Sequence, residues 1–121
     1  MPQRVLIVED EPNIANALRF LLTREGFEVT VEVDGAKALE QVTAIGADVV
    51  ILDVMLPNRS GFDILRDLQS HDGTSPPVLM LTAKGQARDR DRAGQLGATA
   101  FMTKPFSNAD VVDTVKRLAE A

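Results

Sequence analysis

The stretch Val49-Val50-Ile51-Leu52-Asp53 is a run of four apolar residues that ends in a carboxylate. Three of the four apolar residues are β-branched, and a short unbroken run of this kind is typical of a strand buried on both faces of a parallel sheet. Asp53 would then lie at the carboxyl end of that strand. In open α/β sheets this is the edge where ligands bind.

Further stretches along the chain have the pattern of a β-strand. Apolar runs at 5–8 and 78–81 also predict buried strands, and residues 100–103 predict a shorter one. Residues 29–33 alternate valine with polar residues, which predicts a half-exposed strand at a sheet edge. Helices are expected in the intervals between the strands and after the last one, and they begin near Pro12, Asp34, Phe62, Gln86 and Ser107.

Strand and helix therefore alternate five times, with short connections. This order predicts an α/β fold, a doubly wound five-stranded parallel sheet with helices on both faces. We expect the flavodoxin-like strand order 2-1-3-4-5. The length suits a single domain over residues 1–121.

Composition narrows the function classes. The net charge of -5 argues against direct binding of nucleic acid, which needs a basic face. The chain has no cysteine, so disulfides and thiolate metal sites are excluded, and a cytoplasmic location is expected. No apolar stretch approaches the roughly 20 residues of a membrane helix, so no membrane contact is expected.

Four of the predicted strands end in polar residues: Glu9-Asp10, Asp53, Thr82 and Lys104. Each has an ordinary explanation alone, as a helix-terminal acid, a turn residue, a cap or a surface lysine. In a parallel sheet, however, all four ends meet at one rim. Three carboxylates at close range repel one another, and Mg²⁺ would relieve that repulsion because it prefers oxygen ligands. A cation, an ammonium and a hydroxyl together suit a phosphoryl group, which the Asp53 carboxylate could accept as an acyl phosphate.

Four segments in order resemble the receiver domains of bacterial two-component response regulators, which include the chemotaxis receivers. They are VLIVEDEP (5–12), DVVILDVMLPNRSGFDIL (48–65), VLMLTAK (78–84) and GATAFMTKPF (97–106). The resemblance covers essentially the whole chain. It implies a signalling switch, with no enzyme activity beyond assisting its own phosphoryl transfer and autodephosphorylation.

The resemblance implies that Asp53 accepts a phosphoryl group from a phosphohistidine on a histidine kinase or a histidine phosphotransfer protein. Glu9, Asp10, Asp53 and the backbone carbonyl of Met55 would hold Mg²⁺ or Mn²⁺, Asp10 directly and Glu9 through water. Gly61 is expected in a tight turn where a positive φ is easiest for glycine.

Further roles follow from the same resemblance. Lys104 would pair with the phosphoryl oxygens, and Thr82 would move toward them, with Phe101 following inward as an aromatic switch. An aromatic residue in an apolar strand is more often plain core, but the family pattern favours the switch. Ala83 would keep the approach to the site open, and Pro105 is expected to follow a cis peptide bond.

The expected helix at about 86–96 carries the alternating charges of residues 88–92 and little apolar surface. We expect it to be the least stable helix and the easiest to shift, so that phosphorylation alters protein binding on the fourth helix, fifth strand and fifth helix. Thr99-Ala100 stands where many DNA-binding members of the family carry two acids, which usually pair with basic residues on partner helices in an activated dimer. Lys116 and Arg117 remain on the last expected helix, but the acidic half of this contact is missing. A monomer or weak dimer is therefore expected. No effector domain is expected within the 121 residues, so output would pass through contact with an unknown downstream protein, or the chain is a fragment.

Other functions stay open. An aspartyl-phosphate hydrolase of the haloacid dehalogenase type usually has a second aspartate two residues after the nucleophile, where this chain has Met55. A flavodoxin-like cofactor binder needs a phosphate-binding first loop, but the acids at 9–11 would repel phosphate. An inactive receiver used for docking would not need the intact set of acids, threonine and lysine.

Overall fold

The computed structural model describes residues 2–70, 75–82 and 87–120 and contains a five-stranded parallel sheet with the order β2-β1-β3-β4-β5. The predicted fold class and strand order are confirmed. Neighbouring strands pair in parallel, as in the register Leu6 with Val50 and Leu52 with Met80. The strands are β1 (Arg4–Val8), β2 (Glu28–Glu32), β3 (Val49–Asp53), β4 (Val78–Thr82) and β5 (Ala100–Thr103).

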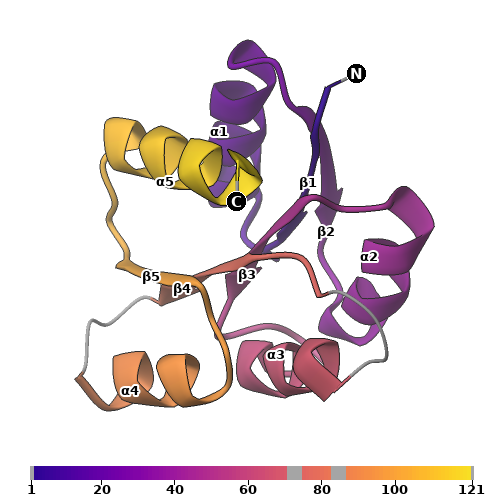
Figure 1. The fold of residues 1–121 in the computed structure, drawn as a ribbon, viewed down its shortest axis with the longest axis vertical. Helices are drawn as coiled ribbons and strands as arrows, with labels where there is room; N and C mark the ends of the chain where they lie inside the picture. Colours follow the sequence, from indigo (N-terminus) through magenta and orange to yellow (C-terminus); the bar gives the residue numbers. More distant parts are fainter. Residues whose placement is uncertain (1, 71–74, 83–86, 121) are drawn as a thin grey trace.

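Helices cover both faces of the sheet (Figure 1). On one face lie α1 (Pro12–Arg24) and α5 (Asn108–Glu120). On the other face lie α2 (Ala38–Ile45), α3 (Gly61–Ser70) and α4 (Ala87–Gln95). Because alternate residues of each strand point to opposite faces, the sheet separates two hydrophobic clusters.

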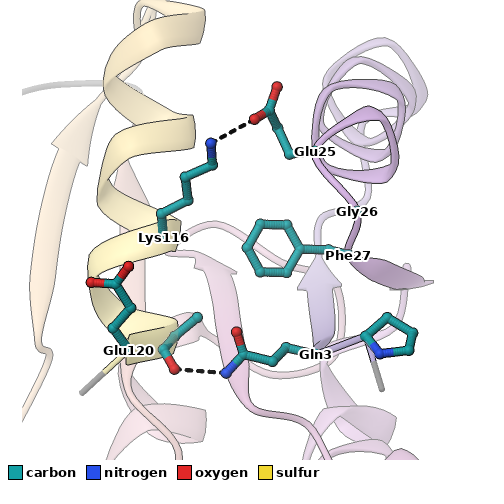
Figure 2. A pocket seen from close by; sticks show the side chains of 8 residues that line it. Gln3, Glu25, Gly26, Phe27, Lys116 and Glu120 are labelled. Atoms are coloured by element: carbon teal, nitrogen blue, oxygen red, sulfur yellow. Dashed lines mark hydrogen bonds and ion pairs between the residues drawn. The ribbon is translucent and has the colours of Figure 1, made fainter.

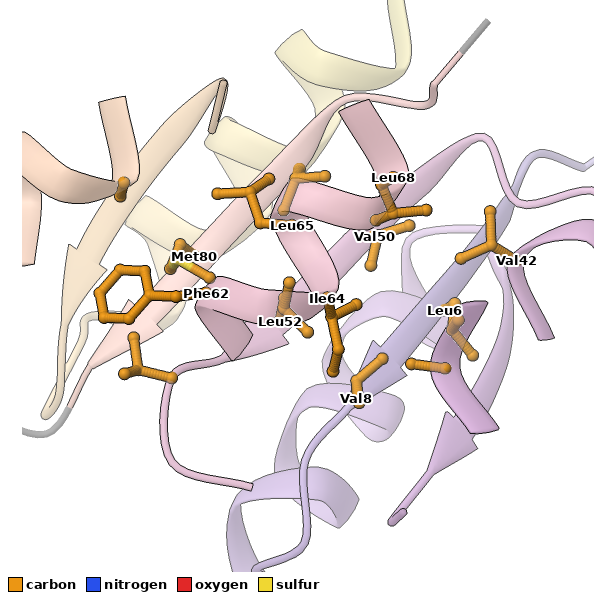
Figure 3. Packing of buried hydrophobic residues seen from close by; sticks show 14 residues of the cluster. Leu6, Val8, Val42, Val50, Leu52, Phe62, Ile64, Leu65, Leu68 and Met80 are labelled. Atoms are coloured by element: carbon orange, nitrogen blue, oxygen red, sulfur yellow. The ribbon is translucent and has the colours of Figure 1, made fainter. Parts of the chain in front are cut away.

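The central strands are the most buried. Every residue of β3 and β4 is buried, whereas the edge strands β2 and β5 are mostly half-exposed, as the alternating pattern predicted for β2. Figure 3 shows how α3 lies on the strands and fills one cluster, whose labelled members are Leu6, Val8, Val42, Val50, Leu52, Phe62, Ile64, Leu65, Leu68 and Met80. Removing one such buried leucine side chain costs about 2–5 kcal/mol of stability, so this packing holds the strand ends in place.

The start of the second helical segment differs from the prediction. Asp34 does act as a cap, because its side chain accepts a hydrogen bond from the backbone N–H of Ala36 at 2.9 Å. However, the turn that it caps is a short 3₁₀ helix, η1 (Gly35–Lys37), and α2 begins only at Ala38. Asp34 therefore caps a turn within the loop between β2 and α2, not the first turn of α2 itself.

The predicted helix at 86–96 is α4, which spans Ala87–Gln95. Position 86 lies outside the described residues. Ala93 is fully buried, while the charged residues at 88–92 are exposed or half-exposed. None of the helices in the described ranges has the length and hydropathy needed to cross a membrane.

Candidate functional site

The carboxyl ends of four strands bring together most of the side chains singled out from the sequence. Asp53 is the last residue of β3 and Thr82 the last of β4. Glu9 and Asp10 directly follow β1, and Lys104 directly follows β5. Backbone hydrogen bonds continue just past the strands and fix these positions. The Lys104 N–H donates to the Thr82 carbonyl at 2.7 Å, and the Glu9 N–H donates to the carbonyl of Glu32 at 3.1 Å.

Three carboxyl groups form the centre of the site. Glu9, Asp10 and Asp53 each offer an oxygen, and these oxygens all lie within 4.8 Å of one another. Glu9 and Asp53 are buried, with 1% and 5% of their surface exposed, whereas Asp10 is open to solvent. Lys104 joins the cluster, with its ammonium nitrogen 2.7 Å from Glu9 Oε1 and 3.2 Å from Asp53 Oδ1.

The electrostatics of this cluster favour a bound cation. Burial and, next to it, the Glu9 carboxylate together raise the pKa of Asp53 to about 6, although Lys104 partly offsets both. Burial works to lower the pKa of Lys104, but the hydrogen bond that its ammonium donates to Glu9 and the charge of Asp53 outweigh this effect and raise that pKa. Three carboxyl groups thus face one ammonium. A hard divalent cation such as Mg²⁺ fits this all-oxygen donor set and would offset the unfavourable burial of Asp53.

The loop after Asp53 corrects one prediction. Gly61 does not have a positive φ; the described glycines that do are Gly26, Gly46 and Gly97. Glycine is required at 61 because a Cβ there would lie 2.1 Å from the backbone oxygen of Asp53. The Gly61 N–H also donates to the Val54 carbonyl at 2.9 Å. Close backbone contact at the base of this loop, rather than backbone conformation, excludes a side chain.

The remaining predicted residues lie around this centre. Thr82 is buried at the end of β4. Phe101 is half-buried in β5, and the guanidinium of Arg90 on α4 lies over its ring, 5.6 Å from the centroid. The peptide bond before Pro105 is cis, as expected. Ala83 lies outside the described residues.

Of two surface pockets, one borders the acid cluster and the other lies away from it. One, of about 410 Å³, borders the site and is lined by Glu11, Ile14, Lys104, Pro105 and Phe106. The other, of about 310 Å³, lies beside the first residues of β1 and the last turn of α5, away from the carboxyl ends of the strands. Figure 2 shows it beneath the ion pair of Lys116 with Glu25, whose atoms are 2.7 Å apart, so Lys116 is engaged within its own chain.

One polar chain beside the site was not predicted. Glu32, at the end of β2, is buried and accepts a hydrogen bond from the N–H of Asp34. The carboxylate of Asp34 in turn accepts a hydrogen bond from the side-chain amide of Asn58, in the loop after Asp53. The sequence offered only a weak signal for this link, because Glu32 is simply one of the polar residues that alternate with valine in β2.

Comparison with known proteins agrees with this geometry. The family model described as "Response regulator receiver domain" matches residues 5–116. The sensory transduction protein RegX3 of Mycobacterium tuberculosis is 44% identical over 112 residues, which are 93% of this chain and 48% of RegX3. The transcriptional regulatory protein TrcR of the same organism is 40% identical over 117 residues, 97% of this chain and 45% of TrcR. The chain therefore spans about half the length of these curated relatives.

Solved structures show the same architecture. The chemotaxis protein CheY4 of Vibrio cholerae superposes with a TM-score of 0.87 at 30% identity, covering 98% of this chain and 99% of that one. The receiver domain of the sensor histidine kinase PA1611 of Pseudomonas aeruginosa gives a TM-score of 0.89 at 26% identity and covers both chains completely. The PA1611 domain was solved with a magnesium ion coordinated in its active-site cleft.

Proposed function

Because the chain belongs to the response regulator receiver domain family of two-component signalling, we propose that Asp53 is its phosphoryl acceptor. The observation that carries this proposal is the position of Asp53, which lies at the end of the central strand, within 4.8 Å of two other acids and 3.2 Å from Lys104. The raised pKa of Asp53, about 6, still leaves its carboxyl largely ionised at neutral pH and thus nucleophilic.

In the proposed reaction, a carboxylate oxygen of Asp53 attacks the phosphorus of a phosphohistidine on a histidine kinase or phosphotransfer protein. The new O–P bond forms as the N–P bond breaks, and the bonding electrons return to the imidazole nitrogen. Lys104 supports the transfer because its ammonium can donate to the phosphoryl oxygens. The hollow beside Lys104, with Ile14 and Phe106 among its lining residues, offers space for the donor to approach.

Glu9, Asp10, Asp53 and the backbone carbonyl of Met55 would hold a Mg²⁺ ion in this site. When bound, the cation neutralises phosphoryl oxygens and orients them for transfer. The same oxygen donors would also accept Mn²⁺. Glu9 is already paired with Lys104, whereas Asp10 is exposed. For both reasons Asp10 would bind the metal directly more readily than Glu9.

We propose that the phosphorylated state is transmitted through Thr82 and Phe101. A phosphoryl group adds up to about two negative charges and three acceptor oxygens, which would draw the Thr82 hydroxyl and Lys104 toward Asp53. Phe101 follows on the neighbouring strand β5, where Arg90 of α4 contacts its ring. A shift of this ring would therefore alter α4, β5 and α5 as a protein-binding surface.

Hydrolysis of the acyl phosphate would reset the switch. The family resemblance implies that Ala83 would keep the approach to Asp53 open for the attacking water, and that Pro105 would help to position Lys104. Output would pass to a downstream protein by direct contact with the chain as a monomer or weak dimer.

The decisive experiment incubates the chain with acetyl phosphate and Mg²⁺ and measures its intact mass. We expect one added phosphoryl group in wild type, none in Asp53→Asn, and an unchanged yield in Asp63→Asn, a control acid in the first turn of α3. Labelling that persists in Asp53→Asn would refute Asp53 as the acceptor. A folded wild type that takes no label would instead favour an inactive docking module.

A further inference from the structure

We propose that Asp34 is a positioning residue for the acid site, acting through Asn58 on the loop between β3 and α3. The inference rests on the proposed function, since it concerns the metal bound at the same site. Asp34 forms hydrogen bonds with Glu32, Ala36, Lys37 and Asn58, none of which would bind the metal or the phosphoryl group.

The first link joins Asp34 to the end of β2. The buried carboxylate of Glu32 accepts hydrogen bonds from the Asp34 N–H at 3.1 Å and from the Gln41 side chain of α2 at 3.2 Å. The carbonyl of Glu32 also accepts the N–H of Glu9, one of the three acids of the site. The start of the β2–α2 loop is thus fixed relative to the acid cluster.

The second link joins Asp34 to the loop after Asp53. One carboxylate oxygen of Asp34 accepts two hydrogen bonds, from the Asn58 amide and from the Ala36 N–H, both at 2.9 Å. These bonds lower the pKa of Asp34, the bond from Asn58 most strongly, so the carboxylate is charged and held at neutral pH. Hydrogen bonds to a charged acceptor are the stronger kind.

Asn58 is itself in an unusual conformation. Its φ is 67°, and within the described residues it is the one non-glycine residue with a positive φ. Asparagine tolerates this left-handed region better than most residues, but strain at a non-glycine position persists only when the surroundings enforce it. The bond to Asp34 is such a restraint. The positive φ of Asn58 together with this hydrogen bond indicates that the loop between β3 and α3 is held in one conformation beside the site.

Direct backbone contact reinforces the link. The Gly35 N–H donates to the Pro57 carbonyl at 3.2 Å. A Cβ on Gly35 would lie 2.4 Å from the Arg59 carbonyl oxygen and 3.0 Å from that of Pro57. The far side of the β3–α3 loop therefore rests on the backbone of the β2–α2 loop. Arg59 also forms an ion pair with Asp67 of α3, which ties the loop to that helix.

These contacts affect the proposed metal site because the loop between β3 and α3 begins directly after Asp53 and contains Met55. Met55, whose backbone carbonyl we propose as a ligand, lies between Asp53 and Pro57. Its position is bounded by the Val54–Gly61 hydrogen bond at the base of the loop and by the contacts of Pro57 and Asn58 at its far side. Releasing Asn58 should loosen this carbonyl without removing any ligand. Outer partners of metal ligands commonly influence affinity in this way.

The test is Mg²⁺ binding followed by isothermal titration calorimetry, since the chain has no tryptophan or tyrosine to report it by fluorescence. Asp34→Ala and Asn58→Gly each remove the tether, and glycine at 58 keeps the positive φ available. We expect roughly three- to tenfold weaker Mg²⁺ binding in each, and no further loss in the double variant. Asp34→Asn keeps an acceptor oxygen but loses the charge, and should therefore weaken binding less than Asp34→Ala does. Gly35→Ala should weaken binding through the steric clash alone.

Two controls separate positioning from general stability. Asp63→Ala breaks the exposed Arg66 pair on α3, and Gly94→Ala adds a methyl where nothing lies within 4 Å; neither should change the Mg²⁺ affinity. Folding is followed by circular dichroism. Folded Asp34→Ala and Asn58→Gly that bind Mg²⁺ as tightly as wild type would overturn this inference alone, even if their melting temperatures fall. A wild type that binds no Mg²⁺ would overturn the proposed metal site and this inference with it.

Discussion

Lys104 and Glu9 are 95 residues apart in the chain, yet the lysine donates a 2.7 Å hydrogen bond to the glutamate carboxylate in a buried site. The lysine side chain is only 15% exposed and the glutamate 1%. Because Asp53 lies 3.2 Å from the same ammonium, Lys104 compensates two buried acids at once. Parallel pairing of β4 with β5, and of β1 with β3, makes this meeting possible.

Replacing Lys104 with methionine should raise the pKa of Asp53 above its value of about 6, because Lys104 lowers that pKa. The change is measured by following the carboxyl carbon of Asp53 by NMR across a pH titration of the metal-free protein. Lys116→Met, which removes an exposed ion pair with Glu25, is the matched control and should leave Asp53 unchanged. An unchanged titration in Lys104→Met would mean that the two side chains do not interact in solution.

The stability of the metal-free protein should depend on the ionisation of Asp53. Its pKa is raised on folding, so the folded protein binds this proton more tightly than the unfolded chain does. The resulting stabilisation is fully present below about pH 4 and is lost as the pH rises through about 6. Asp53→Asn should therefore raise the free energy of unfolding at pH 7 by roughly 1 kcal/mol or more, and much less at pH 4.

Urea denaturation of wild type and Asp53→Asn at the two pH values measures this difference. Asp63→Asn should show no comparable gain. Added Mg²⁺ should stabilise wild type and narrow the gap at pH 7, because a ligand that binds only the folded state shifts the equilibrium toward it. A gap of the same size at pH 4 and pH 7 would contradict the role of burial and Glu9 in raising this pKa.

Substituting Gly61 should disturb the site through steric contact. A Cβ at 61 would meet the Asp53 carbonyl oxygen at 2.1 Å, so Gly61→Ala should lower the free energy of unfolding by roughly 1–3 kcal/mol. Asn tolerates positive φ values, yet Gly61→Asn should be equally damaging, since the clash remains. Gly94→Ala should be neutral or stabilising, because its position in α4 is open. Tolerance of both substitutions at 61 would show that the loop moves aside freely.

Amide hydrogen exchange should be faster in α4 than in α1 or α5. Among the side chains that the structure describes, α1 and α5 each bury four, whereas α4 contributes the buried Ala93 and two arginines whose guanidinium groups lie over rings of neighbouring elements. Arg92 lies 4.5 Å from the centroid of the Phe62 ring, so Arg92→Gln should speed exchange in α4 further, by a factor corresponding to roughly 0.5–1 kcal/mol. Arg24→Gln, whose ring contact with Phe20 lies on α1, should leave α4 unchanged. Exchange in α4 as slow as in α1 would contradict this prediction.

The sequence by itself determined the sheet and the membership of the acid cluster. Each buried strand is a local apolar run, and its last apolar residue shows where the strand ends, so Glu9, Asp53 and Lys104 could be assigned to one rim before any contact was known. This inference needs only the period of the pattern and the rule that alternating strands and helices form a parallel sheet.

Only the tertiary structure decided how the loops around that rim support one another. The positive φ expected at Gly61 is found at Asn58 instead, while Gly61 is small because the backbone of Asp53 passes against it. The link from Glu32 through Asp34 to Asn58 likewise depends on two loops meeting in space. A local pattern fixes which residues form a strand, but contacts between loops depend on the packing of the whole chain, which no single stretch of sequence contains.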